Sequence, residues 1–317
     1  MSPSLTRADR YAGCLLGLAA GDALGTTLEF KEPGSFTPLA DMVGGGPFDL
    51  LPGQWTDDTS MALCLAASLV ERRAFDPLDQ LQRYWDWYHD GYMSSNGTCF
   101  DIGSTTSLAL MSFRRHPEPY PGSTSPNTAG NGSLMRLAPV PMAFARQPRL
   151  AVERSAESSR TTHGAPAAVD ACRYFGGLLV GALDGLDKQA LLAERFSPIP
   201  DLWAEAPLHP EIDAVAAGSF KSKNPPDIAG SGYVVRTLEA ALWAFYQTDT
   251  FQDGALRVVN LGDDADTTGA VYGQIAGAFY GLESIPQSWR DQLTLRATIL
   301  ELAQGLLSLA ETPSGAA

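Results

Sequence analysis

Basic residues are scarce in this sequence. Its 317 residues include 22 lysines and arginines against 36 aspartates and glutamates, and the formal net charge is −14. A surface of this charge repels a phosphate backbone, so direct binding of nucleic acid is not expected. A small anionic ligand stays compatible with the sequence, because a helix N-terminus can hold phosphate locally.

Cysteine is also rare, and no CxxC pair occurs. The four cysteines stand alone at Cys14, Cys64, Cys99 and Cys172. Their spacing predicts neither a zinc site nor a disulfide framework. Three of them lie in apolar segments with helical spacing, where buried free thiols are common.

Long hydrophobic runs and a signal-peptide pattern are missing. The first residues, MSPSLTRADRYAG, have no apolar core, and the apolar run after Cys14 is interrupted at Asp22. A run this short does not span a bilayer. We therefore expect a cytoplasmic protein without membrane insertion.

Alternating strand patterns are absent too, and helical spacing dominates. With 44% hydrophobic residues, no repeat and no linker, the sequence predicts one all-α, multi-helix domain over 1–317. The helices are expected at 6–28, 57–73, 76–89, 103–115, 131–146, 149–162, 165–185, 187–195, 231–248, 251–260, 266–281 and 287–310. Three longer irregular segments, 29–54, 117–130 and 196–230, are expected to be functional loops.

Glycine, in contrast, is abundant and regularly spaced. The glycines that recur every four residues are Gly13, Gly17, Gly21 and Gly25, then Gly177, Gly181 and Gly185, and finally Gly269, Gly273, Gly277 and Gly281. Each glycine inside a helix costs about 0.5–1 kcal/mol relative to alanine, so the rows require compensation. A spacing of four aligns them along one side of a helix, where a second backbone can approach. We predict that at least one row faces another helix at short distance.

Two short segments carry more carboxylates than a helix start needs. They are Thr56-Asp57-Asp58-Thr59 and Asp263-Asp264-Ala265-Asp266-Thr267-Thr268. One Asp or Thr side chain is enough to cap a helix, and each segment taken alone is compatible with a simple cap. The surplus carboxylates repel one another and raise one another's pKa unless a cation lies between them.

Divalent cations would resolve this repulsion, since Mg²⁺ and Mn²⁺ prefer carboxylate, hydroxyl and water oxygens. Four aspartates balance the charge of two such ions, and two threonines add neutral oxygens. The candidate ligands are Thr56, Asp57, Asp58, Asp264, Asp266 and Thr267. Two ions about 3.5–4 Å apart would form a binuclear hydrolytic centre.

Other metal and catalytic motifs do not fit. A calcium-binding EF-hand loop counted from Asp264 would place Ile275 where the bidentate glutamate belongs. The sequence also contains no HExxH motif, no Walker loop and no nucleophile elbow.

Several segments together resemble the ADP-ribosylglycohydrolase family, in particular its bacterial branch typified by dinitrogenase-reductase-activating glycohydrolase. The segments are GCLLGLAAGDALGTTLEF, WTDDTS, FDIGSTT, GNGSLMRLAPV, the Thr162-His163 pair and GDDADTTGAVYGQIAGAFYG, which run over 13–281. The resemblance implies a single compact all-α fold and a binuclear Mg²⁺ or Mn²⁺ centre with the six ligands named above. Asp263 matches no ligand position, and we interpret it as a helix-start residue or a residue that supports the ligands.

The same resemblance assigns catalytic residues. Glu29 matches a glutamate that acts as acid/base or positions the sugar, beside the metal-binding Asp57 and Asp266. Asp101 matches an acidic residue at the scissile end. Ser104 departs from the pattern, because the bacterial type often has asparagine there. From its local sequence alone, Glu29 could equally be a solvated loop carboxylate.

The remaining family positions imply an ADP-ribose site. The residues expected to bind substrate are Asp101, Gly103, Ser104, Gly130, Asn131, Gly132, Ser133, His163, Gly232 and Tyr233. Glycines let a phosphate approach backbone N–H groups at a helix start. Three alternatives stay open: a tight turn for GNGS, a helix cap or core residue for His163, and simple packing for Tyr233.

The resemblance thus implies hydrolysis of the bond between ADP-ribose and a protein side chain, with arginine favoured as the acceptor. The expected partners are an ADP-ribosylated protein as substrate and ADP-ribose as product. The alternatives are hydrolysis of O-linked ADP-ribose, on serine or a small conjugate, and a non-catalytic relative that binds ADP-ribose or has a structural role.

Overall fold

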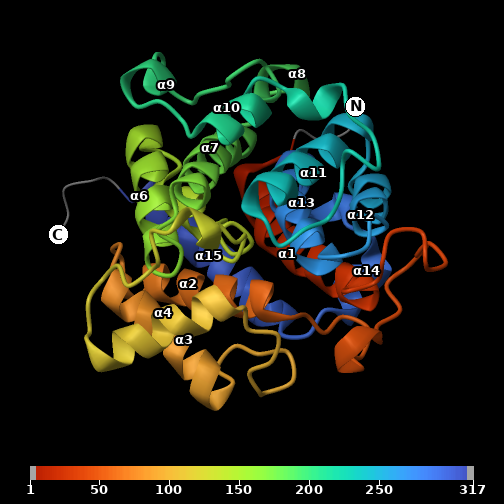
Figure 1. The fold of residues 1–317 in the computed structure, drawn as a ribbon, viewed down its shortest axis with the longest axis horizontal. Coiled ribbons are helices and arrows are strands. Elements are labelled where there is room, and N and C mark those ends of the chain that lie inside the picture. The colour runs from red at the N-terminus through yellow and green to blue at the C-terminus, as the bar shows by residue number, and fades with distance from the viewer. Residues whose placement is uncertain (1–4, 313–317) are drawn as a thin grey trace.

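The protein is built from α-helices joined by short loops (Figure 1). The computed structural model describes residues 5–312, and within them no strand forms. The α-helices are α1 (Arg7–Gly25), α2 (Asp57–Arg72), α3 (Pro77–Asp90), α4 (Ser104–Arg115), α5 (Pro139–Phe144), α6 (Pro148–Arg160), α7 (Pro166–Leu183), α8 (Lys188–Leu191), α9 (Leu202–Glu205), α10 (Pro210–Ala216), α11 (Val234–Gln247), α12 (Phe251–Val259), α13 (Ala265–Tyr280), α14 (Gln287–Gln292) and α15 (Arg296–Glu311). The predicted all-α class and single compact domain are confirmed.

Helices α1 and α13 lie side by side along their whole length (Figure 1). Their glycine rows face each other. A Cβ atom placed on Gly17 would lie under 3.0 Å from the carbonyl oxygen of Gly273, and one on Gly273 would lie equally close to the carbonyl oxygen of Gly17. The same holds between Gly13 and Gly277. The prediction of close packing along a glycine row is confirmed, and we call this contact the glycine seam.

The third glycine row has a different role. Gly177 of α7 faces the side chain of Pro198, and Gly181 faces the side chains of Leu191 and Phe196. Gly185 follows the helix with φ +86°, a backbone conformation that favours glycine. This row therefore admits side chains rather than a second helix backbone.

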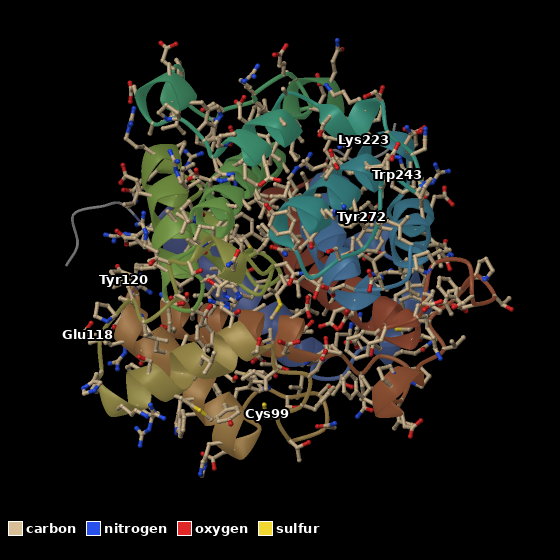
Figure 2. The ribbon with its side chains drawn as sticks, in the orientation of Figure 1. Cys99, Glu118, Tyr120, Lys223, Trp243 and Tyr272 are labelled. Atoms are coloured by element: carbon tan, nitrogen blue, oxygen red, sulfur yellow. The ribbon has the colours of Figure 1, made fainter. Side chains whose placement is uncertain are left out.

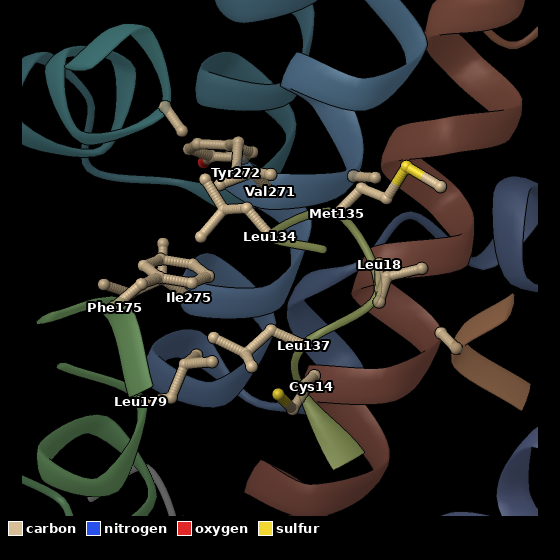
Figure 3. Packing of buried hydrophobic residues seen from close by; sticks show 14 of the residues in the cluster. Cys14, Leu18, Leu134, Met135, Leu137, Phe175, Leu179, Val271, Tyr272 and Ile275 are labelled. Carbon is tan, nitrogen blue, oxygen red and sulfur yellow. The ribbon is translucent and has the colours of Figure 1, made fainter. Parts of the chain in front are cut away.

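The segment 131–138 was expected to be helical, and this expectation is wrong. It crosses the core as a series of turns, with Leu134 and Leu137 packed between α7 and α13 (Figure 3). Gln274 of α13 satisfies its buried backbone: Gln274 Nε2 donates to the carbonyl of Met135 at 2.7 Å, and Gln274 Oε1 accepts from the Ala138 amide at 2.8 Å. Side-chain hydrogen bonds thus satisfy part of this backbone, alongside turn bonds such as that from the Leu137 amide to the Leu134 carbonyl, and α5 begins only at Pro139.

Two further expectations also need correction. The segment 196–230 is not irregular throughout, since it contains α9, α10 and the short 3₁₀ helix η4 (Ser219–Lys221). The helix expected at 287–310 is divided into α14 and α15, because Leu295 adopts φ +49° and interrupts the helical backbone. None of the helices within residues 5–312 is long and apolar enough to cross a membrane.

Candidate metal centre and active site

The two acidic clusters meet at the starts of α2 and α13. The Thr56 hydroxyl lies 3.1 Å from Asp266 Oδ2 and 3.2 Å from Asp58 Oδ2. The Thr267 hydroxyl lies 3.4 Å from Asp58 Oδ2, although these residues are 209 positions apart in the chain. The glycine seam explains the meeting, because it fixes α13 against α1, and α1 in turn holds the start of α2.

Asp22 of α1 provides that link, and the sequence analysis gave it no role. Its Oδ1 accepts hydrogen bonds from the amide and the hydroxyl of Thr56, both at 2.9 Å. Its Oδ2 accepts from the amide of Thr59 at 3.0 Å and from its hydroxyl at 2.6 Å. A buried carboxylate inside an apolar helix needs such partners, and this requirement was the signal available in the sequence.

Within residues 5–312, the centre contains buried oxygen atoms that have no hydrogen-bond partner. These are Asp58 Oδ1, Asp266 Oδ1 and Glu29 Oε2. Carboxylate oxygens of Asp22, Asp58 and Asp266 lie within 4.8 Å of one another, and so do those of Glu29, Asp101 and Asp266. Unpaired buried oxygens of this kind, with hydroxyls beside them, fit a hard divalent cation such as Mg²⁺ or Mn²⁺.

Electrostatics point in the same direction. Burial raises the pKa of Asp57, Asp58 and Asp266 well above the usual value, and repulsion from neighbouring carboxylates raises each pKa further. Burial also raises the pKa of Asp264, although a hydrogen bond from Asn131 Nδ2 at 2.8 Å works against this shift. Without a cation the cluster therefore retains protons that isolated aspartates would lose at neutral pH.

Glu29 and Asp101 form a second carboxyl pair beside the cluster. Burial, followed by the charge of Asp101, raises the pKa of Glu29 to about 9. Burial raises the pKa of Asp101 to about 7, and the neighbouring Glu29 carboxyl opposes the rise. Glu29 is therefore the protonated partner near neutral pH, and the pair can hold or pass a proton.

These groups line a pocket of about 710 Å³. Of the residues expected to bind substrate, nine line it: Asp101, Gly103, Ser104, Gly130, Asn131, Gly132, His163, Gly232 and Tyr233. Ser133 is not brought to the pocket. It is buried beneath the lining, and its hydroxyl lies 2.8 Å from the Ser159 hydroxyl. Thr56 and Asp58 are also fully buried, behind the lining residues Asp57 and Asp266.

His163 faces the pocket as a neutral imidazole. Burial, together with the positive charge of Arg136, lowers its pKa to about 3. Arg136 Nη2 donates to the Thr162 hydroxyl at 2.7 Å, and this hydroxyl lies 2.8 Å from His163 Nδ1. The Thr162 oxygen accepts from Arg136 and can turn its own proton toward Nδ1; in that arrangement the ring hydrogen sits on Nε2. His163 can thus donate a hydrogen bond to a ligand oxygen.

Arg136 is a second residue that the sequence analysis missed. It is fully buried, stacks over the Tyr84 ring at 4.7 Å, and donates to the Gly132 carbonyl at 2.7 Å. It therefore holds the GNGS turn and the Thr162-His163 pair in one arrangement. A lone arginine within the apolar run LMRLAPV was the signal in the sequence, because a buried guanidinium needs several acceptors.

A comparison of the whole chain with known families decides the class. The model of the ADP-ribosylglycohydrolase family matches residues 3–316. The chain belongs to the ADP-ribosylglycohydrolase family. The resemblance inferred from the sequence motifs is thus confirmed, and the protein is an enzyme of the ADP-ribosylglycohydrolase class.

Relatives and a solved structure agree with this ADP-ribosylglycohydrolase assignment. The ADP-ribosylarginine hydrolase Tri1 of Serratia proteamaculans is 42% identical over 308 residues, which cover 97% of this chain and 81% of that protein. The ADP-ribosyl-[dinitrogen reductase] glycohydrolase of Rhodospirillum rubrum is 32% identical, with coverage of 95% and 97%. A solved ADP-ribosylglycohydrolase-related protein complex matches with a TM-score of 0.84 at 44% identity, covering 96% of this chain and 99% of that one.

Proposed function

We propose that the protein is a metal-dependent hydrolase that removes ADP-ribose from modified arginine side chains of proteins. The observation that carries the proposal is the meeting of the two acidic clusters in a pocket that Glu29 and Asp101 also line. Relatives named ADP-ribosylarginine hydrolase, at 42% and 44% identity, support the arginine linkage.

Two divalent ions, Mg²⁺ or Mn²⁺, are part of this proposal. Their proposed ligands are Thr56, Asp57, Asp58, Asp264, Asp266 and Thr267. When bound, the ions would supply positive charge that orients ribose hydroxyls and acidifies water. The buried oxygens of Asp58 and Asp266 that find no hydrogen-bond partner among residues 5–312 support this assignment.

The chain's own residues then account for binding and proton transfer. The glycine-rich turn at Gly130 and Gly132, with the Nε2–H of His163, suits the oxygens of a diphosphate or ribose. The carboxyl pair of Glu29 and Asp101 would stabilise positive charge that develops on the sugar as its bond to the acceptor breaks. Glu29 holds the proton of the pair and would position the sugar or transfer that proton.

The test measures release of ADP-ribose from arginine-modified and serine-modified protein, each with Mg²⁺, Mn²⁺ or EDTA. We expect the arginine substrate to be cleaved at least about tenfold faster than the serine substrate, and EDTA to abolish both rates. Faster cleavage of the serine substrate would replace the proposed linkage by an O-linked one. Tight binding of ADP-ribose without turnover of either substrate would contradict a catalytic role.

A dependence on pH should accompany metal binding. For an acid whose folded-state pKa is raised, the folded protein binds more protons than the unfolded one, so stability falls as pH rises from the unfolded to the folded pKa. With Glu29 near 9 and Asp101 near 7, the metal-free protein should lose stability between about pH 5 and 9. We expect its melting temperature in EDTA to fall by roughly 4 °C or more over this range.

Added Mn²⁺ should raise the melting temperature more at high pH than at low pH, because the ion binds deprotonated carboxylates. The control is the double variant Glu29→Gln, Asp101→Asn, whose melting temperature should vary less with pH. Melting curves in EDTA that stay level from pH 5 to 9 would show that the carboxyl groups are not shifted as described.

A further inference from the structure

Three phenylalanine rings are in contact beside the pocket, and one of them, Phe30, lines it. Phe30 and Phe48 have ring centroids 6.5 Å apart, at an interplanar angle of 73°. Phe48 and Phe100 have centroids 5.2 Å apart, at 57°. We call these three rings the aromatic ledge. They come from three separate segments of the chain, and Phe48 ends the short 3₁₀ helix η2 (Gly46–Phe48). Cys99, which directly precedes Phe100, is labelled in Figure 2.

Phe30 has a strained backbone conformation, and burial of its side chain does not compensate for the strain. Its side chain lines the pocket yet is 67% exposed, and its backbone has φ +60°, where a bulky side chain is strained. Two backbone hydrogen bonds fix it: the Phe30 amide donates to the Asp263 carbonyl at 2.7 Å, and the Asp263 amide donates to the Lys31 carbonyl at 2.8 Å. The ring gains little burial for this strain, and strain of this kind concentrates at ligand sites.

The ledge adjoins the carboxyl pair through the chain itself. Phe30 directly follows Glu29, and Phe100 directly precedes Asp101. Of the residues that line the pocket, five are acidic (Glu29, Asp57, Asp101, Asp264 and Asp266) and none is lysine or arginine. The two proposed ions would balance the metal-binding aspartates, which leaves Asp101 of the carboxyl pair as the carboxylate beside the ledge. A cation placed between the ledge and Asp101 therefore meets complementary charge.

We infer that the aromatic ledge binds the guanidinium group of the arginine from which ADP-ribose is removed, and so determines the preference for arginine over serine. This inference rests on the proposed function. Guanidinium is planar, weakly hydrated and permanently charged, so it stacks on aromatic faces while its N–H groups donate to carboxylates. A serine acceptor offers neither a plane nor a charge, and the ledge gives it no comparable contact.

The experiment compares the wild type with Phe30→Ala and Phe30→Tyr, using ADP-ribosyl-arginine, ADP-ribosyl-serine and ADP-ribose as probes. Affinities are measured calorimetrically in EDTA, where no cleavage is expected, and kcat and KM are measured with Mn²⁺. We expect Phe30→Ala to weaken binding of ADP-ribosyl-arginine by about three- to thirtyfold, with ADP-ribose and ADP-ribosyl-serine changed less than about twofold. Phe30→Tyr keeps the aromatic face and should restore most of the affinity.

Leu51→Ala is the matched control, because Leu51 is also 67% exposed but does not line the pocket. It should bind all three probes like the wild type. The inference is overturned if Phe30→Ala weakens all probes equally, or if it leaves ADP-ribosyl-arginine unaffected. The test is separate from the proposed function because it compares affinities and not rates. A wild type that binds ADP-ribosyl-arginine and ADP-ribosyl-serine without cleaving them contradicts the proposed hydrolase. The ratio of the two affinities, in the wild type and in Phe30→Ala, still decides the role of the ledge.

Discussion

The Asp266→Asn variant is expected to lose nearly all metal affinity and hydrolysis while remaining folded. Asp266 is buried, its Oδ2 lies 3.1 Å from the Thr56 hydroxyl, and its Oδ1 has no hydrogen-bond partner in the described part of the chain. Asparagine keeps the size of the side chain but removes a charge that a cation needs. We expect metal affinity to fall at least about 100-fold and the rate at least about 1,000-fold, since metal catalysis contributes several kcal/mol.

The stability of the metal-free variant should change in the opposite direction. Burial and repulsion from Glu29 and Asp58 raise the pKa of Asp266, so its ionised form is unfavourable in the folded protein. At neutral pH the folded wild type is destabilised because it must hold a proton on Asp266, and the neutral asparagine avoids this cost. In EDTA at neutral pH, Asp266→Asn should therefore melt at a higher temperature than the wild type, and added Mn²⁺ should no longer raise it. Asp57→Asn should behave in the same way.

Asp263→Asn provides the control for both measurements. Asp263 is an exposed neighbour of the cluster, and its φ of +58° suits asparagine well. Calorimetric titration with Mn²⁺ and melting curves in EDTA should find this variant close to the wild type. Should Asp266→Asn bind Mn²⁺ as tightly as Asp263→Asn does, the proposed ligand set would be wrong.

Local patterns in the sequence predicted most helices correctly. Helices α2 and α13 combine an acidic start with an apolar run, which are both features of a single segment. The glycine rows on α1 and α13 also predicted a close helix contact, because four glycines in one helix are unfavourable without one. The acidic helix starts and the glycine rows could be predicted because each is written in one short segment of the sequence.

Features that depend on partners far along the chain were harder to predict. Asp22 looked like an interruption of an apolar run, and its four hydrogen bonds come from Thr56 and Thr59. The segment 131–138 has helical spacing, but its backbone bonds to Gln274 of a distant helix. The family resemblance brought Glu29 and Asp101 into one site, whereas no local pattern could place them beside the aromatic ledge.

The Gly273→Ala variant is expected to destabilise the protein severely. Alanine in a helix interior normally stabilises by about 0.5–1 kcal/mol relative to glycine. Here the new Cβ atom would lie under 3.0 Å from the carbonyl oxygen of Gly17, and neither helix backbone can move aside without opening the glycine seam. We expect the free energy of unfolding to fall by about 3–5 kcal/mol, measured by chemical denaturation with helical circular dichroism as the signal.

Gly103→Ala and Gly305→Ala separate this effect from a general property of glycine. A Cβ on Gly103 meets no atom of the described residues within 4 Å, so stability should change by less than about 0.5 kcal/mol. A Cβ on Gly305 meets the side chain of Val70, which can shift, so a smaller loss than at Gly273 is expected. If Gly273→Ala were as stable as Gly103→Ala, the seam would not need its glycines.

Gly273→Ala should also weaken metal binding. The seam holds Asp266 on α13 against Asp22 on α1, and Asp22 fixes the start of α2 through Thr56. A separation of the two helices therefore moves the two acidic clusters apart. The folded fraction of Gly273→Ala should bind Mn²⁺ at least about tenfold more weakly than the wild type, although the substitution touches none of the proposed ligands. Unchanged affinity would show that the clusters are held together independently of the seam.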